Sequence, residues 1–282
     1  MHIDLNVDAG EALTPKEELV ELALIPLVSS INIACGAHAG DVASMRRLVA
    51  VARSQGVSIG AHPGYPDPVH RGRQAMTLAP DAVRRLVRDQ VAMLATFADE
   101  RGARLAHVKP HGALYNQAAV DRSLAAAIAR GVHDVDPSYR LVGLEGSCLL
   151  EEGRAAGLQV WGEGFIDRAY KADGTLVPRH EPGALLTDPA LAVTQALTML
   201  LTGFVRAADG VSRVAVQPDT LCVHADTPGA IDLVRRLHIA LADKGIGIGE
   251  GMPPRRWRGQ DPRAADTAAA VTRVRFGTRP PQ

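Results

Sequence analysis

The chain has 282 residues, of which 46% are hydrophobic and 22% charged, and its formal net charge is zero. These values are typical of a globular protein with a large core and give no indication of a nucleic-acid or membrane partner. Three widely spaced cysteines, Cys35, Cys148 and Cys222, fit neither a zinc motif nor a disulfide framework. With no secretory signal pattern and no apolar run near the roughly 20 residues that span a bilayer, we expect a cytoplasmic protein with reduced thiols.

The first predicted element is a β-strand over residues 2–8, where apolar and polar side chains alternate strictly. Asp4, Asn6 and Asp8 form its polar face. Buried carboxylates must be paired, protonated or bound to a metal, which makes these residues candidates for a functional site. An exposed edge strand would show the same pattern and is the alternative.

Strands and helices then alternate along the chain. Further strands are predicted at 29–35, 57–61, 105–109, 140–144, 158–163 and 220–223, with a local pairing around 213–216. Helices are predicted at 15–28, 41–56, 80–101, 189–203 and 228–244. A further helix is predicted to begin at residue 121, and another to end near residue 156. This alternation predicts a parallel sheet covered by helices.

Polar residues gather at, or just past, the C-terminal ends of these strands. They are His38, Asp41, His62, Lys109, His111, Glu145, Glu163, Asp167, His224 and Asp226. An open doubly wound sheet would bring together only those of two neighbouring strands, whereas a barrel places all strand ends on one rim, where active sites lie. We therefore predict an α/β fold, an irregular (β/α) barrel of about seven parallel strands, forming a single catalytic domain over residues 1–250.

Residues 251–282 differ in composition from the rest of the chain. They contain seven Arg against Asp261 and Asp266, a net charge of +5 that leaves −5 for residues 1–250. Because no core-forming pattern is present, we predict a basic Pro/Arg/Ala-rich C-terminal extension. A short strand around residues 271–276 is the alternative.

Two familiar motifs are absent. The chain has no G-x-x-x-x-G-K-[ST] loop for nucleotide phosphates and no G-x-S-x-G elbow of a serine hydrolase. A zinc or manganese site is possible instead, because imidazole and carboxylate groups suit such metals. The candidate ligands are Asp4, Asp8, His38, His62 and His111. Hydrogen bonds among these groups without a metal are the alternative.

Several long motifs occur together in a fixed order. They are Asp4-Leu-Asn-x-Asp-x-Gly-Glu11, Asn32-Ile-Ala-Cys-Gly-x-His-Ala-Gly-Asp41, Gly60-Ala-His-Pro-Gly-Tyr-Pro-Asp67, Gly72-Arg-x-x-Met76, His107-Val-Lys-Pro-His-Gly-x-Leu-Tyr-Asn116, the Asp167-Arg-x-Tyr170 stretch to Arg179, and Leu221-Cys-Val-His224. On these motifs the chain resembles the lactam-utilisation (LamB/YcsF) family over roughly residues 1–250. Ala9 and Ala225 are small departures from the family pattern.

The resemblance implies a barrel akin to the glycoside hydrolase/deacetylase group. It also implies the role of the A subunit in an ATP-dependent 5-oxoprolinase, which opens the lactam ring of 5-oxo-L-proline (pyroglutamate) to L-glutamate together with subunits B and C. ATP and its Mg²⁺ would then be bound through the partner subunits, and a divalent metal in the barrel stays an open question. The alternatives are a metal-dependent deacetylase or amidohydrolase that needs no ATP, and a non-catalytic scaffold for subunits B and C.

Lactam opening requires three roles at the rim. A cation, Lys109 or Arg168, holds the substrate carboxylate. A base, Asp8 or Asp41, acting alone or through His38, activates water. A donor, which is His62, His111 or Arg73, stabilises charge on the lactam oxygen. Predicted catalytic residues are Asp8, His38, Asp41, His62, Lys109 and His111, and predicted substrate-binding residues are Asn6, Glu11, Arg73, Tyr115, Asp167, Arg168 and His224. Structural alternatives are an ion pair of Lys109 with Asp8 or Asp4, a loop-stabilising Asp167–Arg168 pair, and packing of Tyr115 beside the mouth.

Overall fold

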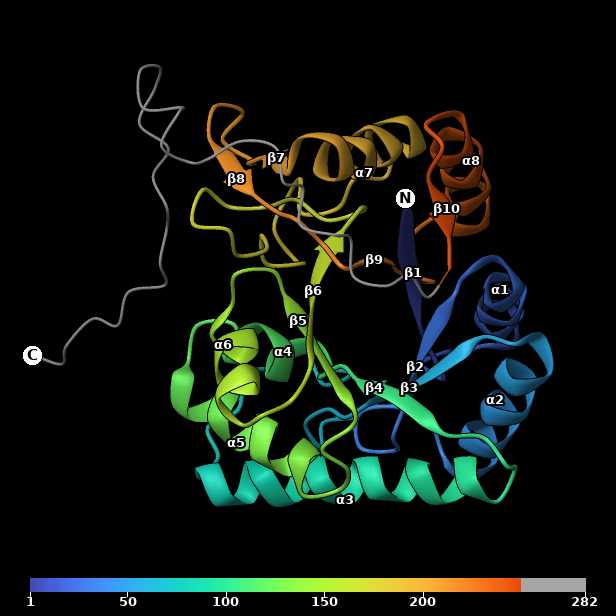
Figure 1. Cartoon of the computed structure of the whole chain (residues 1–282), viewed down its shortest axis with the longest axis vertical. Coiled ribbons are helices and arrows are strands. Elements are labelled where there is room, and N and C mark those ends of the chain that lie inside the picture. Colours follow the sequence, from blue (N-terminus) through green and yellow to red (C-terminus); the bar gives the residue numbers. More distant parts are fainter. Residues whose placement is uncertain (250–282) are drawn as a thin grey trace, which may run out of the picture.

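The computed structural model of this protein describes residues 1–249, which form a closed parallel barrel (Figure 1). Its strands follow the order β1-β2-β3-β4-β5-β6-β9, and β9 pairs again with β1 to close the ring. The bounds are β1 (His2–Ala9), β2 (Ser30–Ala34), β3 (Ser58–His62), β4 (Leu105–Val108), β5 (Arg140–Leu144), β6 (Val160–Phe165) and β9 (Thr220–Val223). The predicted barrel of about seven parallel strands is confirmed.

Helices surround this barrel. They are α1 (Pro15–Leu24), α2 (Val42–Gln55), α3 (Pro80–Asp99), α4 (Gly112–Ala118), α5 (Arg122–His133), α6 (Cys148–Ala155), α7 (Pro189–Thr202) and α8 (Ala230–Asp243). The predicted helix 15–28 ends earlier than expected, because Pro26 lacks an N–H and the chain tightens into the 3₁₀ turn η1 (Ile25–Leu27). The short helix α4, which begins four residues after β4 ends, was not predicted.

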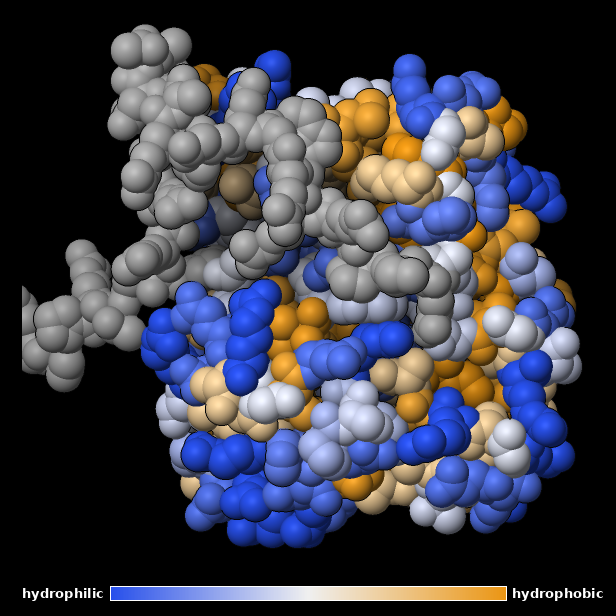
Figure 2. Space-filling view, viewed as in Figure 1, coloured by the Kyte–Doolittle hydropathy of each residue, from blue (hydrophilic) through white to orange (hydrophobic). Residues whose placement is uncertain are grey.

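Two small pairings complete the fold. The local pairing expected around 213–216 is present as β8 (Arg213–Ala215), which lies antiparallel to β7 (Phe204–Arg206). The short strand β10 (Gly247–Ile248) joins the first residues of β1 and was not predicted. In Figure 2 hydrophilic residues dominate over α3, while hydrophobic residues gather over α7, where Leu191 and Leu201 are exposed.

The alternation of β1 divides the strand between two environments. Ile3, Leu5 and Val7 pack into the hydrophobic core. Asp4 and Asn6, on the opposite face, are each only 2% exposed. The edge-strand alternative is therefore wrong, because the polar face of β1 points into a closed barrel whose interior is hydrogen-bonded.

The expectations about membrane spans and cysteines can be compared with residues 1–249, which the structure describes. Within residues 1–249 no helix combines the length and the apolar composition needed to cross a membrane. Cys35, Cys148 and Cys222 are buried free thiols. The predicted basic extension at 251–282 lies outside the described residues.

Candidate active site

A cavity of about 880 Å³ opens at the C-terminal ends of the barrel strands. Its lining includes nine of the predicted site residues, namely Asp8, Glu11, His62, Arg73, Lys109, His111, Tyr115, Arg168 and His224. These residues lie together because parallel strands deliver their final residues to one rim.

Lys109 lies at the floor of this cavity, surrounded by acceptors. Its Nζ is 2.9 Å from Asp8 Oδ1, 2.8 Å from Glu163 Oε1 and 3.2 Å from Asn6 Oδ1. An ammonium has three N–H donors, so these neighbours can use all of them. The predicted ion pair with Asp8 is confirmed. The geometry therefore favours a positioning role for Lys109 over capture of a substrate carboxylate.

The same contacts set the charges at the floor. Burial by itself lowers the pKa of Lys109, but the negative charges of Asp8 and Glu163 raise it well above its ordinary value. Burial likewise raises the pKa of Asp8, and the nearby His62 and Lys109 outweigh it and hold that pKa well below the ordinary value. Both groups are thus charged near neutral pH, and Asp8 faces the cavity as a carboxylate.

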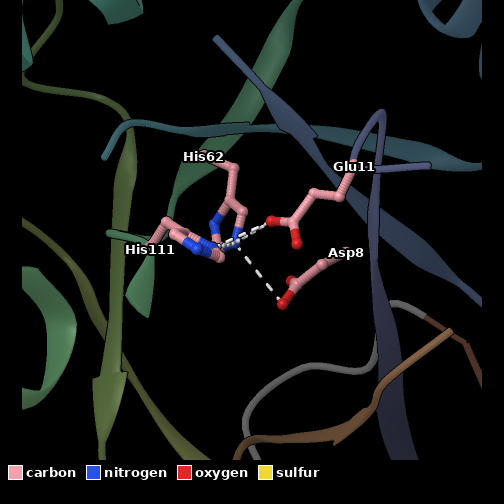
Figure 3. A group of neighbouring side chains, drawn as sticks. All are labelled: Asp8, Glu11, His62 and His111. Carbon is pink, nitrogen blue, oxygen red and sulfur yellow. Dashed lines mark hydrogen bonds and ion pairs between the residues drawn. The ribbon is translucent and has the colours of Figure 1, made fainter. Parts of the chain in front are cut away.

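Beside Lys109, two carboxylates and two imidazoles converge on one point (Figure 3). They belong to Asp8, Glu11, His62 and His111, whose nearest ligand-type atoms all lie within 4.8 Å of one another. His111 Nδ1 is 2.8 Å from Glu11 Oε1, and His62 Nε2 is 3.4 Å from Asp8 Oδ2. Glu11, expected only to bind substrate, is central to this group, which we call the histidine–carboxylate cluster.

His38 supports the cluster from behind and is absent from the cavity lining. Its ring stacks on that of His111 with 3.8 Å between centroids, and its Nε2 lies 3.1 Å from Glu11 Oε1. Burial lowers the pKa of His38 to about 4, although the hydrogen bond to Glu11 opposes this shift. We therefore expect a neutral imidazole that orients Glu11.

Two residues predicted for the site lie elsewhere. Asp41 is exposed and caps helix α2, with its Oδ1 accepting the Ser44 N–H at 2.7 Å. Its carboxylate was correctly expected to start a helix, and that role leaves it outside the cavity lining. Asp4, a candidate metal ligand, instead accepts hydroxyl hydrogen bonds from Ser29, Ser30 and Thr220 within the barrel.

Backbone geometry explains how the imidazoles come so close together. Gly72 has φ +64°, and a Cβ there would lie 2.8 Å from His38 Cβ and 3.0 Å from His111 Cδ2. The preceding Arg71 also has positive φ, 55°, which is uncommon for a non-glycine residue. Its carbonyl oxygen is 2.8 Å from His111 Nε2. The left-handed turn at 71–72 therefore orients His111.

The mouth of the cavity carries arginines. Arg73 and Arg179 contact different oxygens of Asp226, the former at 3.0 Å. Arg168 is 5% exposed and donates to the carbonyl oxygens of Ala184 and Val177. Arg73 and Arg179 are therefore better placed than Arg168 to meet an anionic substrate.

The remaining predicted residues support neighbouring groups. Asp167, which the alternative paired with Arg168, accepts hydrogen bonds from His224 and Thr227. Burial would raise the pKa of Asp167, but His224 and these hydrogen bonds lower it to about 2. Tyr115 is buried and its hydroxyl donates to Glu163 Oε2 at 2.8 Å. It thus positions Glu163 as well as packing beside the mouth.

Asn6 and several residues without a predicted role complete the site. Asn6 donates to Glu163 Oε1 at 3.0 Å, below the cavity. Asn32 donates to Asp8 Oδ1 at 2.8 Å. Glu163, Arg71 and Arg179 were also missed as site residues. The sequence did offer a signal for two of these residues, because Glu163 ends a predicted strand and Asn32 lies within a long motif. No sequence signal indicated Arg71.

The closed barrel and its cavity define a (β/α)-barrel protein with a buried histidine–carboxylate site at the carboxyl end of its strands. A family model, described as the LamB/YcsF family, matches residues 3–254. The chain belongs to the LamB/YcsF family, as its motifs indicated.

Individual relatives agree with this assignment. The 5-oxoprolinase A subunit of Geobacillus kaustophilus is 48% identical over 254 residues, covering 90% of this chain and 97% of the relative. That of Methylococcus capsulatus is 50% identical over 246 residues, covering 87% and 94%. The crystal structure of a lactam utilization protein from Thermus thermophilus has a TM-score of 0.81 and 44% identity, covering 89% of this chain and all (100%) of that one.

Proposed function

We propose that this chain is the A subunit of an ATP-dependent 5-oxoprolinase and opens the lactam ring of 5-oxo-L-proline to give L-glutamate, together with subunits B and C. Relatives named as the 5-oxoprolinase A subunit, similar over nearly their whole length, support the substrate. The observation that carries a catalytic role for this chain is the position of Asp8, which pairs with Lys109 at 2.9 Å and faces a large cavity beside His62.

In this proposal Asp8 orients the attacking water. Lys109 and Asn32 both hold Oδ1, so Oδ2, which lies 3.4 Å from His62 Nε2, is the oxygen that accepts a hydrogen bond from water with a remaining lone pair. Water adds to the lactam carbon, whose oxygen carries the phosphoryl group from ATP. The ring C–N bond then breaks, and the protons of this water pass to the ring nitrogen, which becomes the amine. The acyl phosphate that remains is hydrolysed to the side-chain carboxylate of glutamate and inorganic phosphate. Arg73 and Arg179 bind the substrate carboxylate, for which a guanidinium offers paired donors.

The reaction needs ATP because ring closure competes with ring opening. The amine of glutamate is tethered to its own carboxyl group, and such tethering can equal roughly 10⁵–10⁸ M of reactant. With no P-loop in this chain, we assign phosphorylation of the lactam oxygen to subunits B and C and ring opening to this chain. ATP and Mg²⁺ then bind through the partner subunits.

The test is glutamate release from 5-oxo-L-proline by purified protein, with ATP and subunits B and C each omitted in turn. We expect release only from the complete mixture. Asp8→Asn, which keeps the size of the side chain, should lower kcat by roughly 10²–10⁴. The matched control Asp41→Asn changes a carboxylate outside the cavity and should leave kcat within about twofold, because Asn also caps helices well.

Other outcomes select the other functions. Full activity of subunits B and C alone would make this chain a scaffold. Ring opening by this chain without ATP would favour a metal-dependent amidohydrolase, a function to which the donor types of the histidine–carboxylate cluster are also suited. Nucleotide binding by this chain alone would place the ATP site here.

A further inference from the structure

The two imidazoles of the histidine–carboxylate cluster have fixed tautomers. His62 Nδ1 is 2.7 Å from the carbonyl oxygen of Lys109, and His111 Nε2 is 2.8 Å from that of Arg71. A carbonyl oxygen can only accept, so both of these nitrogens carry the N–H. In neutral imidazoles the opposite nitrogens, His62 Nε2 and His111 Nδ1, therefore present lone pairs.

These lone pairs point at the same place. His62 Nε2 and His111 Nδ1 are 3.0 Å apart, which is a hydrogen-bond distance. With these tautomers, however, neither neutral ring has a proton to donate to the other. Glu11 Oε1 lies 2.8 Å from His111 Nδ1 and 3.5 Å from His62 Nε2. Asp8 Oδ2 lies 3.4 Å from His62 Nε2. With both rings neutral, four electron-rich atoms surround one point. Protonation of the rings or a bound metal ion would relieve their mutual repulsion, and the metal ion can contact all four atoms at once.

We propose that Asp8, Glu11, His62 and His111 bind one divalent transition-metal ion through two imidazole nitrogens and two carboxylate oxygens. Zn²⁺ accepts this donor set, and the mixture of nitrogen and oxygen donors also suits Mn²⁺. The proposal concerns binding alone and does not rest on the lactam activity. Of the ligands predicted from the sequence, it keeps Asp8, His62 and His111, replaces Asp4 by Glu11 and leaves His38 behind the site.

Three of the ligands are also held at a second side-chain atom, as is usual for metal ligands, and Glu11 is held through its backbone. The two histidines donate to backbone carbonyls. Asp8 accepts from Lys109 and Asn32 through Oδ1, which turns Oδ2 toward the cluster. The backbone N–H of Glu11 donates to Glu21, which fixes the turn after β1. Such outer contacts orient the donor atoms before a metal arrives.

A second group of potential ligands is less suitable. Asp8, Cys222 and His224 also approach one another among the described residues. However, Cys222 Sγ lies 3.3 Å from the Lys109 ammonium, which would repel a cation. His224 Nδ1 is bonded to Asp167, which leaves its Nε2 available, so the ammonium is the feature that decides against this group. The geometry therefore favours the cluster with His62 and His111.

The test uses the full chain, stripped with a chelator and titrated calorimetrically with Zn²⁺ in the absence of 5-oxoproline and ATP. We expect one Zn²⁺ per chain. His111→Gln and Glu11→Gln should weaken binding roughly a hundredfold or more, since loss even of an outer partner commonly costs 10–100-fold. His180→Gln is the control, because His180 lines the same cavity without belonging to the cluster.

Co²⁺ absorption identifies the donor atoms independently. The proposed site contains no sulfur, so the bound ion should show ligand-field bands without a thiolate charge-transfer band, and Cys222→Ser should leave the spectrum unchanged. Circular dichroism of each metal-free variant checks folding, and Glu11→Gln substitutes for His111→Gln if the latter is unfolded. Failure of the wild type to bind Zn²⁺, equal binding by the folded variants, or loss of binding in Cys222→Ser would overturn the proposal.

Discussion

Lys109 and Asp8 form an ion pair inside the barrel, with 2.9 Å between Nζ and Oδ1. The side chain of Lys109 is 3% exposed and that of Asp8 11% exposed, so the pair lies where the closed strands meet the cavity. Glu163 approaches the same ammonium at 2.8 Å. One buried cation therefore balances two carboxylates and keeps Asp8 ionised at the cavity floor.

Replacing this cation should affect stability and turnover together. Lys109→Met leaves Asp8 and Glu163 without the cation that they share, and breaking a buried ion pair in this way typically costs about 3–5 kcal/mol. We expect a lower denaturation midpoint in urea and loss of glutamate release in the reconstituted complex. Lys109→Met combined with Glu163→Gln should recover part of the stability. A folded Lys109→Met protein with normal turnover would remove Lys109 from the site.

Gly72→Ala tests the close packing of the imidazoles. The added Cβ meets His38 and His111, and positive φ costs a further 1–2 kcal/mol or so for a residue with a Cβ. Gly210→Ala is the matched control, because Gly210 has φ +74° and no atom within 4 Å of the new Cβ. Chemical denaturation should show a larger loss for Gly72→Ala, accompanied by loss of activity. Equal losses with full activity would contradict the close packing.

The arginines at the mouth should act on substrate binding. Arg179→Gln removes one of the two guanidinium groups beside Asp226, and we expect KM for 5-oxo-L-proline to rise roughly tenfold with kcat changed less, the signature of lost uniform binding. Arg84→Gln is the control, since Arg84 pairs with Asp134 on the outer helices. A fall in kcat at unchanged KM would show instead that Arg179 acts on the chemical step.

Glu145 should make stability depend on pH. Burial, followed by the charge of Asp219, raises the pKa of Glu145 from 4.5 to about 7. The folded protein therefore holds this proton more tightly than the unfolded chain, so the contribution to stability is complete below about pH 4.5 and is lost as pH rises through 7. Glu145→Gln should flatten this part of the profile and stabilise the protein relative to wild type at pH 8. Thermal unfolding between pH 4 and 8 measures the difference, and parallel profiles would contradict it.

Local patterns in the sequence predicted the architecture well. The strict alternation in residues 2–8 placed Asp4, Asn6 and Asp8 on one face, because successive side chains of a strand point to opposite sides. Polar residues after successive strands indicated a closed rim, and Asp41 marked the start of a helix. Long motifs identified the family, which the matches over residues 3–254 confirmed.

Those patterns did not indicate how deep in the barrel each side chain lies or which groups it contacts. Asp4 and Asp8 share a face, yet Asp4 bonds to hydroxyls within the barrel while Asp8 reaches the cavity. Glu11 lies in the turn after β1, and only the tertiary structure brings it beside the imidazoles. Arg71 orients His111 through its backbone carbonyl, where its side-chain identity gives no signal.

By itself, then, the sequence determined the order of the elements, the faces on which side chains lie and the family to which the chain belongs. The tertiary structure decided which acids and imidazoles touch, and so where a cation or substrate fits. The physical reason is that periodicity along a strand records direction only, whereas height above the barrel floor depends on how staggered strands close and on how the connecting loops fold over the mouth.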